Sequence, residues 1–308
     1  MFSVIFPGQG SQFVGMGKEF YDRFDIVKKL FKEADETLSL PLSKIILEGP
    51  KEELDLTVIT QPAIFLISYS IFQVIKKEFN IDLHKAKFFA GHSLGEYSAI
   101  ACAGYLDFQD TIKILKIRGN AMQNSIPKGE GGMVAVLGTT IENIEKILEN
   151  NKNNFLAEIA NDNSEGQIVL SGKIKDLEKL SAVLKVNKIK NIKLPVSAPF
   201  HCSLMNKATE IMRDELGKLK FKKGNIPLIS NITADEIFNA DELKDLLIKQ
   251  IENRVRWRES VINMINKDVK QFIEIGPGKI LAGLVKRVSK EVEVSSINNE
   301  EDIRDIKI

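Results

Sequence analysis

The sequence predicts an α/β protein in which a small α/β domain is inserted into a larger one. In most of the chain, short apolar runs such as residues 2–6 alternate with segments of helical spacing. Strands that read as continuous apolar runs are typical of a parallel sheet covered by helices on both faces. Between residues 128 and 196 the predicted order is strand, helix, strand, strand, helix, strand, which is typical of a ferredoxin-like domain.

The large domain is predicted over residues 1–127 and 197–308, on either side of the insertion. Its first part should contain, in order, a strand at 2–6, a helix at 18–37, a turn at Thr60-Gln61-Pro62, a helix at 62–79, a strand at 87–90, an Ala-rich helix after Gly95 and a helix at 108–124. Its second part should contain a helix at 205–219, a strand at 227–232, a helix at 241–266, a strand at 271–275 and a helix that ends at Lys290.

The inserted domain is predicted over residues 128–196. In order, its elements should be a strand at 133–137, a helix at 141–150, strands at 155–160 and 167–171, a helix at 174–186 and a strand at 189–196. The residues Asn-Asp-Asn-Ser at 161–164 should form the turn between the two middle strands, because these residue types favour turns.

Composition excludes several classes of function. Lys and Arg total 43 and Asp and Glu total 42, so a formal net charge of +1 gives no reason to expect nucleic acid or an anionic membrane as the main partner. The two cysteines and three histidines are too scattered for a disulfide framework or a zinc site. Scarce cysteine also suits a reducing compartment. We therefore expect no metal.

One segment needs to be considered as a membrane span. Residues 56–75 carry no charge, but they include several polar residues and Pro62. A spanning helix is predominantly apolar, so we expect a helix buried in the protein core. The N-terminus shows no basic segment of an export signal. The expectation is a soluble, cytoplasmic monomer.

Residues 91–95 match the pattern G-x-S-x-G of a nucleophile elbow. In such an elbow a strained serine lies in a sharp turn between a strand and a helix, where side chains on the flanking residues would clash. The N–H groups at the start of the helix face any negative charge that forms. Ser93-Leu94-Gly95-Glu96 also matches a helix capping box, and the pattern alone does not decide between the two. Gly91 and Gly95 favour the elbow, because a cap does not require them.

A serine nucleophile needs a base, which is most often a histidine. His92 is adjacent to Ser93 and its side chain should leave the turn in another direction, while His84 lies in a polar connection. His201 remains, at the point where the chain re-enters the large domain. This assignment by elimination competes with a structural role, which is the commoner one for a lone histidine. No Asp or Glu stands out as a third member of a triad.

Six short motifs occur in an order that resembles one enzyme family. They are Pro7-Gly8-Gln9-Gly10-Ser11-Gln12, Thr60-Gln61-Pro62-Ala63, Gly91-His92-Ser93-Leu94-Gly95-Glu96, Arg118-Gly119 with Met122-Gln123, Phe200-His201, and Glu274-Ile275-Gly276-Pro277-Gly278. Together they span nearly the whole chain, and the sequence is similar to malonyl-CoA:acyl-carrier-protein transacylases. The resemblance implies an α/β-hydrolase-like large subdomain with a ferredoxin-like small one, in agreement with the predicted insertion.

The resemblance also implies a mechanism. Ser93 would attack the thioester of malonyl-CoA, and His201 would take its proton and return one to the leaving CoA thiol. The phosphopantetheine thiol of acyl carrier protein would then take the malonyl group from Ser93, in a ping-pong reaction without a bound cofactor. The backbone N–H groups of Gln9 and Leu94 would form the oxyanion hole. A backbone carbonyl, which we assign to Arg256, would orient His201.

The same resemblance assigns residues to substrate binding. Arg118 would bind the malonyl carboxylate through its guanidinium fork, although without the resemblance it would be read as a solvated charge on a helix. Phe200 would leave little room for branched acyl groups, and its alternative role is core packing. Gln61 and Asn161 are supporting candidates, because buried amides often only satisfy turns.

The C-terminal part of the chain contains a basic region. Residues 249–290 contain ten basic and four acidic residues, and we expect part of this region to dock the acidic carrier and to help bind CoA phosphates. The alternative is an ordinary solvated surface.

The competing functions are an esterase or acyl-thioesterase, a non-catalytic carrier-binding protein with a relic site, and a discrete polyketide-synthase acyltransferase. Arg118 argues against a hydrolase, which has no use for a cation facing the acyl group.

Overall fold

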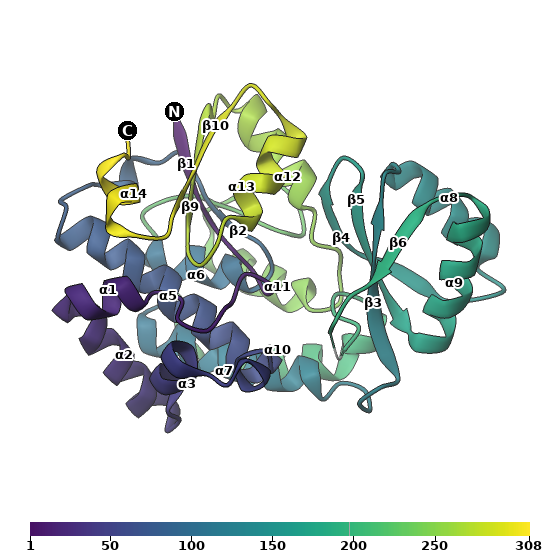
Figure 1. The fold of residues 1–308 in the computed structure, drawn as a ribbon, viewed down its shortest axis with the longest axis horizontal. Helices are drawn as coiled ribbons and strands as arrows, with labels where there is room; N and C mark the ends of the chain where they lie inside the picture. Colours follow the sequence, from purple (N-terminus) through teal and green to yellow (C-terminus); the bar gives the residue numbers. More distant parts are fainter. Residues whose placement is uncertain (197) are drawn as a thin grey trace.

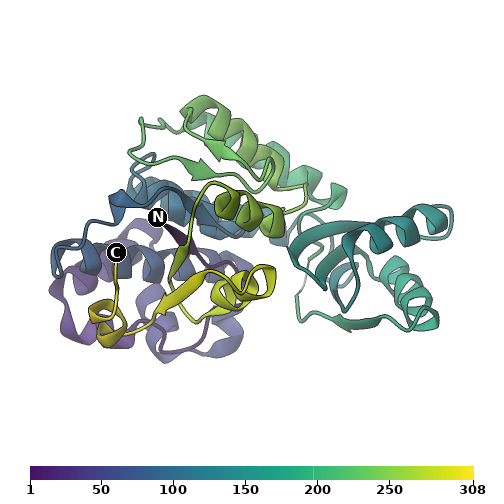
Figure 2. The same ribbon diagram turned by 90° about the horizontal axis from the view of Figure 1, so that it is seen from above.

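Two separate sheets divide the chain into a large and a small domain, which lie side by side (Figures 1 and 2). The computed structural model describes residues 1–196 and 198–308. Residue 197, at which we placed the return to the large domain, lies outside the described residues. The strands of the small sheet fall between residues 131 and 193, inside the predicted insertion.

The large domain begins with β1 (Phe2–Phe6), α1 (Lys18–Arg23), α2 (Asp25–Leu38), α3 (Leu42–Glu48), α4 (Lys51–Leu54), α5 (Thr57–Lys77), the 3₁₀ helix η1 (Leu83–Lys85), β2 (Phe89–Gly91), α6 (Leu94–Cys102) and α7 (Phe108–Gln123). The small domain contains β3 (Gly131–Leu137), α8 (Ile141–Asn151), β4 (Ala157–Ser164), β5 (Gln167–Lys173), α9 (Ile174–Val186) and β6 (Lys190–Lys193). The large domain then continues with η2 (Ser203–Met205), α10 (Asn206–Lys218), β7 (Leu228–Ile229), β8 (Glu236–Ile237), α11 (Ala240–Gln250), α12 (Trp257–Asn266), β9 (Gln271–Ile275), α13 (Ile280–Val288), β10 (Glu293–Ile297) and α14 (Glu300–Arg304).

The large sheet is buried on both faces, as its apolar strands predict. Its strand order is β10-β9-β1-β2-β7-β8, and neighbouring strands are parallel except for β7 and β8. In β1, Val4 and Phe6 share an apolar cluster with α5, α6 and α7, whereas Ile5 packs with Trp257 of α12 and Leu281 of α13. The carboxyl ends of β1, β2 and β7 meet at one edge of the sheet, which is where open α/β sheets place their binding sites.

The small domain has the predicted ferredoxin-like element order. Its strands are antiparallel and lie in the order β4-β5-β3-β6. Val134 and Val136 of β3 pack with apolar residues of α8 and α9, while Met133 and Ala135 join the apolar cluster of the large domain. The small sheet is therefore covered by its own helices on one face and by the large domain on the other.

Helix α5 corrects the predicted turn at Thr60-Gln61-Pro62. The helix begins at Thr57 and contains Pro62 in its second turn. The missing N–H of Pro62 removes a single backbone bond there. The Thr60 hydroxyl donates to the Leu54 carbonyl at 2.6 Å, which ties the start of the helix to the preceding turn. The helix is long and apolar enough to cross a membrane. However, 83% of its apolar 18-residue stretch is buried inside the protein, as in the core helix of a globular protein.

The predicted helix at 241–266 is two helices, α11 and α12, separated by residues 251–256. Within this break the Val255 N–H donates to the Ala160 carbonyl at 2.8 Å, and the Asp162 N–H donates to the Val255 carbonyl at 3.0 Å. Val255 thereby pairs with the edge strand β4 of the small sheet. A contact between the domains thus overrides the helical spacing of the sequence.

Other boundaries also differ from the prediction. Strand β4 runs through the expected turn at 161–164, and the turn follows at Glu165 and Gly166. Strands β6 and β7 are shorter than predicted, and α3, α4, α14, β8 and β10 were not predicted. Asp162 and Asn163 remain in a strand because residues of the large domain bind their side chains, as described below.

Candidate active site

Ser93 lies in a sharp turn between β2 and α6, as the elbow pattern predicts. Its backbone has φ 53° and ψ −111°, a strained combination for a residue with a side chain. A Cβ atom on Gly91 would lie 2.0 Å from the Gly95 backbone, and one on Gly95 would lie 2.2 Å from the Phe6 carbonyl oxygen. Neither site has room for a side chain. The capping box is not formed, since the Ser93 side chain makes no cap hydrogen bond.

The hydroxyl of Ser93 and the imidazole of His201 form a dyad. Ser93 Oγ lies 2.8 Å from His201 Nε2, and His201 Nδ1 lies 2.7 Å from the backbone carbonyl oxygen of Gln250. A carbonyl can only accept, so Nδ1 carries the hydrogen and the Nε2 lone pair faces the serine hydroxyl. The structure thus brings together the predicted nucleophile and the predicted base.

The backbone carbonyl that orients His201 belongs to Gln250, and our assignment of it to Arg256 is wrong. The Arg256 carbonyl instead accepts from the Ser260 hydroxyl at 2.8 Å. Its guanidinium pairs with Glu259. Gln250 occupies the orienting position because α11 ends there, so its carbonyl is one of those that the last turn of the helix leaves unpaired.

His201 is held neutral by its surroundings. Burial, and then the positive charge of Arg118, lower the pKa of His201 to about 3. A neutral imidazole can accept the proton of Ser93. Its backbone has a positive φ of 57°, which is uncommon for residues other than glycine but is adopted more often by His, Asn and Asp than by most others.

Arg118 is a buried cation beside the nucleophile, not a solvated charge. Only 1% of its surface is exposed. Its Nη1 donates to Gln61 Oε1 at 2.8 Å, and its Nη2 donates to Gln250 Oε1 at 2.8 Å and to Ser93 Oγ at 3.1 Å. The guanidinium also lies over the Tyr97 ring, 5.4 Å from its centroid. Gln61 is thus a partner of Arg118 rather than a residue that only satisfies a turn.

The predicted site residues other than Arg256 line one pocket around Ser93. Together with neighbours they are Gln9, Gln61, His92, Ser93, Leu94, Arg118, Met122, Met133, Asn161, Leu194, Val196, Phe200 and His201. Met133, Asn161 and Leu194 come from the small domain, so the pocket lies between the two domains. Phe200 is buried and lines the pocket, while its backbone carbonyl accepts from Ser171 at 2.6 Å.

Sequence reasoning missed two residues, Asn231 and Gln250, that hold the serine turn in place. Asn231 Oδ1 accepts from the Ser93 N–H at 2.7 Å, and its Nδ2 donates to the Gly91 carbonyl at 2.7 Å. Gln250 Nε2 donates to the Ser93 carbonyl at 3.1 Å and to Glu96 Oε2 at 2.6 Å. Asn231 follows strand β7, and a polar residue just beyond the carboxyl end of a parallel strand is the signal that could have identified it.

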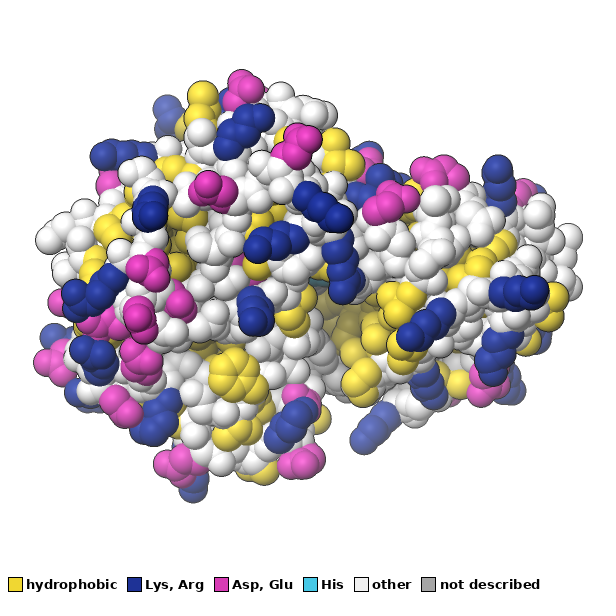
Figure 3. All heavy atoms as spheres, turned by 45° about the horizontal axis from the view of Figure 1, so that its top comes forward, with side chains coloured by type: hydrophobic (Ala, Val, Ile, Leu, Met, Phe, Trp, Pro, Cys, Tyr) yellow, Lys and Arg dark blue, Asp and Glu magenta, His cyan; other side chains and the backbone are white. Residues whose placement is uncertain are grey.

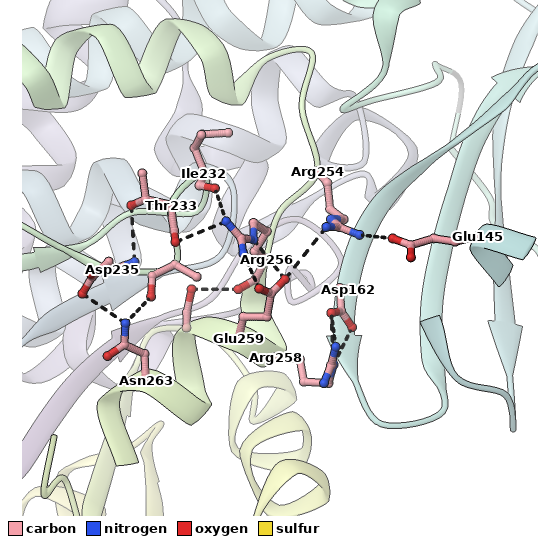
Figure 4. A network of polar contacts seen from close by, with 12 residues as sticks. Glu145, Asp162, Ile232, Thr233, Asp235, Arg254, Arg256, Arg258, Glu259 and Asn263 are labelled. Carbon is pink, nitrogen blue, oxygen red and sulfur yellow. Dashed lines mark hydrogen bonds and ion pairs between the residues drawn. The ribbon is translucent and has the colours of Figure 1, made fainter. Parts of the chain in front are cut away.

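Two arginines form ion pairs across the domain boundary, and a third lies beside them (Figure 4). Arg258 pairs with the buried carboxylate of Asp162 at 3.0 Å, and Arg254 pairs with Glu145 of α8 at 3.1 Å. Arg256 pairs with Glu259 and lies beside both. At the pocket itself, His92 Nε2 lies 2.8 Å from Asn163 Oδ1. These contacts explain why β4 keeps its polar residues in a strand.

Comparison with known proteins agrees with this geometry. The model of the acyl transferase domain family matches residues 3–304. The malonyl CoA-acyl carrier protein transacylase of Bacillus subtilis (strain 168) is 43% identical over 303 residues, which cover 98% of this chain and 94% of that protein.

Two solved structures share the whole architecture. The acyl-carrier-protein-S-malonyltransferase of Bartonella henselae has a TM-score of 0.96 and 39% identity, with 98% of this chain and 97% of that chain covered. A malonyl-transacylase in complex with its type II PKS acyl-carrier protein has a TM-score of 0.94 and 34% identity, with 98% and 97% covered. The chain therefore belongs to the acyl transferase domain family and, within it, to the malonyl CoA-acyl carrier protein transacylases.

Proposed function

We propose that this enzyme moves the malonyl group of malonyl-CoA to the phosphopantetheine thiol of acyl carrier protein through an ester on Ser93. The observation that carries the proposal is the Ser93–His201 dyad with the buried guanidinium of Arg118 3.1 Å from the nucleophile. A dyad alone would serve many acyl transfers, whereas a buried cation at this position selects an acyl group that ends in a carboxylate.

In the first half-reaction, Ser93 Oγ attacks the thioester carbonyl while His201 Nε2 takes the hydroxyl proton. The C–S bond then breaks, and the CoA sulfur leaves with the proton from His201. In the second half-reaction the carrier thiol attacks the malonyl-serine ester, with His201 again as base, and Ser93 recovers its proton. Bonds and protons balance without a bound cofactor.

The oxyanion of each tetrahedral intermediate would lie between the backbone N–H groups of Gln9 and Leu94. Leu94 is the first residue of α6, so the helix provides no acceptor for its N–H. Gln9 lies in the turn after β1 and lines the same pocket. Removing one such preorganised donor typically costs about 3 kcal/mol of transition-state stabilisation.

Arg118 would bind the malonyl carboxylate bidentately, because its planar fork matches a carboxylate. Phe200 and Asn161 would border the acyl group. Water must be kept from the ester, and the pocket between the domains, with Met133, Leu194 and Val196 in its lining, supplies apolar walls. This combination favours transfer over hydrolysis.

The carrier and CoA would dock on part of the basic region at residues 249–290. Arg254, Arg256, Arg258 and Lys267 are already paired with acidic residues. The other six basic residues of 249–290 are exposed, and among them Lys279, Lys286, Arg287 and Lys290 are our choice for the docking surface. Figure 3 shows Lys and Arg side chains beside the hollow between the domains. The enzyme would act as a soluble, cytoplasmic monomer.

Intact-protein mass spectrometry after brief mixing with malonyl-CoA tests the proposal. We expect one malonyl adduct on the wild type, none on Ser93→Ala, and discharge of the adduct by carrier protein. Equal labelling by acetyl-CoA would contradict the role of Arg118. Free malonate released without carrier would identify a hydrolase instead.

Charge reversal at Lys286 and Arg287 tests the docking surface. Replacing both with Glu should slow the carrier-dependent step, most strongly at low salt. An unchanged carrier-dependent rate at low salt would remove these residues from the docking surface.

A further inference from the structure

Glu96 is a buried carboxylate that the reaction does not use. It lies in the first turn of α6, three residues after Ser93, and only 1% of its surface is exposed. Its Oε2 accepts from Gln250 Nε2 at 2.6 Å and from the Asn231 N–H at 3.2 Å. Its Oε1 has no hydrogen-bond partner among the described residues. An ionisable group in such a position is costly to keep unless it does something that a neutral residue cannot.

The side-chain amide of Gln250 lies between Glu96 and Arg118. Its oxygen accepts from Arg118 Nη2 at 2.8 Å, and its nitrogen donates to Glu96 Oε2 at 2.6 Å. Arginine has only donors and an ionised carboxylate has only acceptors, so a single orientation of the amide satisfies both neighbours. The opposite orientation would face NH₂ against the guanidinium and oxygen against the carboxylate.

Among the described residues, Arg118 has no direct carboxylate partner. Its two hydrogen-bonded amides, from Gln61 and Gln250, are neutral. The negative charge of Glu96, on the far side of the Gln250 amide, favours the charged form of Arg118. A direct ion pair would neutralise the charge that the substrate carboxylate needs. An amide in between holds the guanidinium in place and leaves its positive charge for the substrate.

We propose that Glu96 is a positioning residue for acyl selectivity, because its carboxylate fixes the Gln250 amide that holds Arg118 beside Ser93. This inference rests on the proposed function, since it concerns the recognition of a carboxylated acyl group. It also separates two roles of Gln250: the backbone carbonyl orients His201, and the side chain orients Arg118. Glu96 governs the second role.

The test compares two acylating reagents on the same variants. Malonyl-CoA needs Arg118, whereas an uncharged fluorophosphonate labels Ser93 through the dyad alone. Assays are run at about pH 8, where Glu96 is ionised, because burial raises its pKa to about 7. Glu96→Gln keeps the shape and removes the charge, and Glu96→Ala removes both.

We expect Glu96→Gln to lower kcat/KM for ester formation from malonyl-CoA about tenfold or more, mainly through KM, as for loss of a hydrogen bond to a charged group. Glu96→Ala should lower it further. Fluorophosphonate labelling should stay within about twofold of the wild type, because the dyad is intact. The preference for malonyl-CoA over acetyl-CoA should fall in parallel.

Glu274→Gln is the matched control. Glu274 is an equally buried carboxylate of the large domain, but it accepts from the Leu281 and Ala282 N–H groups and from Ser296, away from the pocket. Its replacement should leave the ratio of the two labelling reactions unchanged.

Three results would overturn the inference. The first is an unchanged KM for malonyl-CoA in both Glu96 variants. The second is an equal loss of malonyl and fluorophosphonate labelling, since Glu96 would then support only the serine turn through Asn231. The third is an equal change of the labelling ratio in Glu274→Gln. Failure of the proposed function itself has a different signature, namely a wild type that forms no malonyl ester while fluorophosphonate labels Ser93.

Discussion

The serine turn and the boundary between the domains achieve rigidity in different ways. The turn is built from five consecutive residues, and its glycines remove atoms that would collide with neighbouring backbone. The boundary is built from residues about a hundred positions apart, such as Asp162 and Arg258, and depends on polar groups that find partners. Steric requirements can thus be predicted from neighbouring residues in the sequence. The pairing of distant charged residues can be identified only in the folded structure.

The largest effect should come from crowding the serine turn. Gly95→Ala would place a methyl group 2.2 Å from the Phe6 carbonyl oxygen, so we expect a loss of about 4 kcal/mol in the free energy of unfolding, or failure to fold. Gly217→Ala is the control, because a Cβ atom there would meet no atom of the described residues within 4 Å outside its own stretch of α10. That change should stabilise the protein by about 0.5–1 kcal/mol. Urea unfolding measures both, and equal small effects would contradict the steric account.

The boundary should show an intermediate effect. Arg258→Met leaves the buried Asp162 carboxylate without its partner, and we expect a loss of about 2–3 kcal/mol and a higher KM for malonyl-CoA. Arg254→Met removes a more exposed pair and should cost less than about 1 kcal/mol. Adding Asp162→Asn to Arg258→Met should recover part of the loss. Equal losses for the two arginine variants would show that burial of the pair does not matter.

A smaller effect concerns the pH dependence of the rate at which Ser93 is labelled. The lowered pKa of His201, about 3, means that its imidazole stays neutral well below its ordinary value of 6.5. Fluorophosphonate labelling of wild-type Ser93 should therefore stay level between about pH 8 and about pH 5. Arg118→Gln removes one cause of the shift, so its acid limb should move to higher pH. A wild-type profile with its midpoint at the ordinary histidine value would contradict this assignment.

Metal removal should have no effect. The chemistry is assigned to Ser93, His201 and Arg118, and residues 1–196 and 198–308 contain no group of three His, Cys, Asp or Glu side chains suited to a metal. Transfer activity should survive dialysis against EDTA unchanged. A loss that zinc or magnesium restores would assign an additional site.

The sequence was most informative where local geometry decides the structure. Gly91 and Gly95 favoured the elbow over a helix cap, and the order of strands and helices predicted both domains. Elimination among the three histidines pointed to His201 as the base. Arg118 needed the family resemblance, because nothing in its helix distinguishes it from a surface residue. Gln250 was missed because the helical spacing at 241–266 continues through the break, so that a residue at a helix end was read as lying in a helix interior. The partner that breaks this helix, β4, lies about ninety positions earlier in the chain.

The pairing of Val255 with β4 bears on how substrates enter and leave. The two covalent connections of the small domain lead into β3 and out of β6, whereas Val255 attaches to β4 at the opposite edge of the sheet. This third attachment restrains rotation of the small domain about its two chain connections, and with it the opening of the pocket between the domains. In the proposed reaction, CoA and the carrier arm would use the same opening in turn, as a ping-pong order requires.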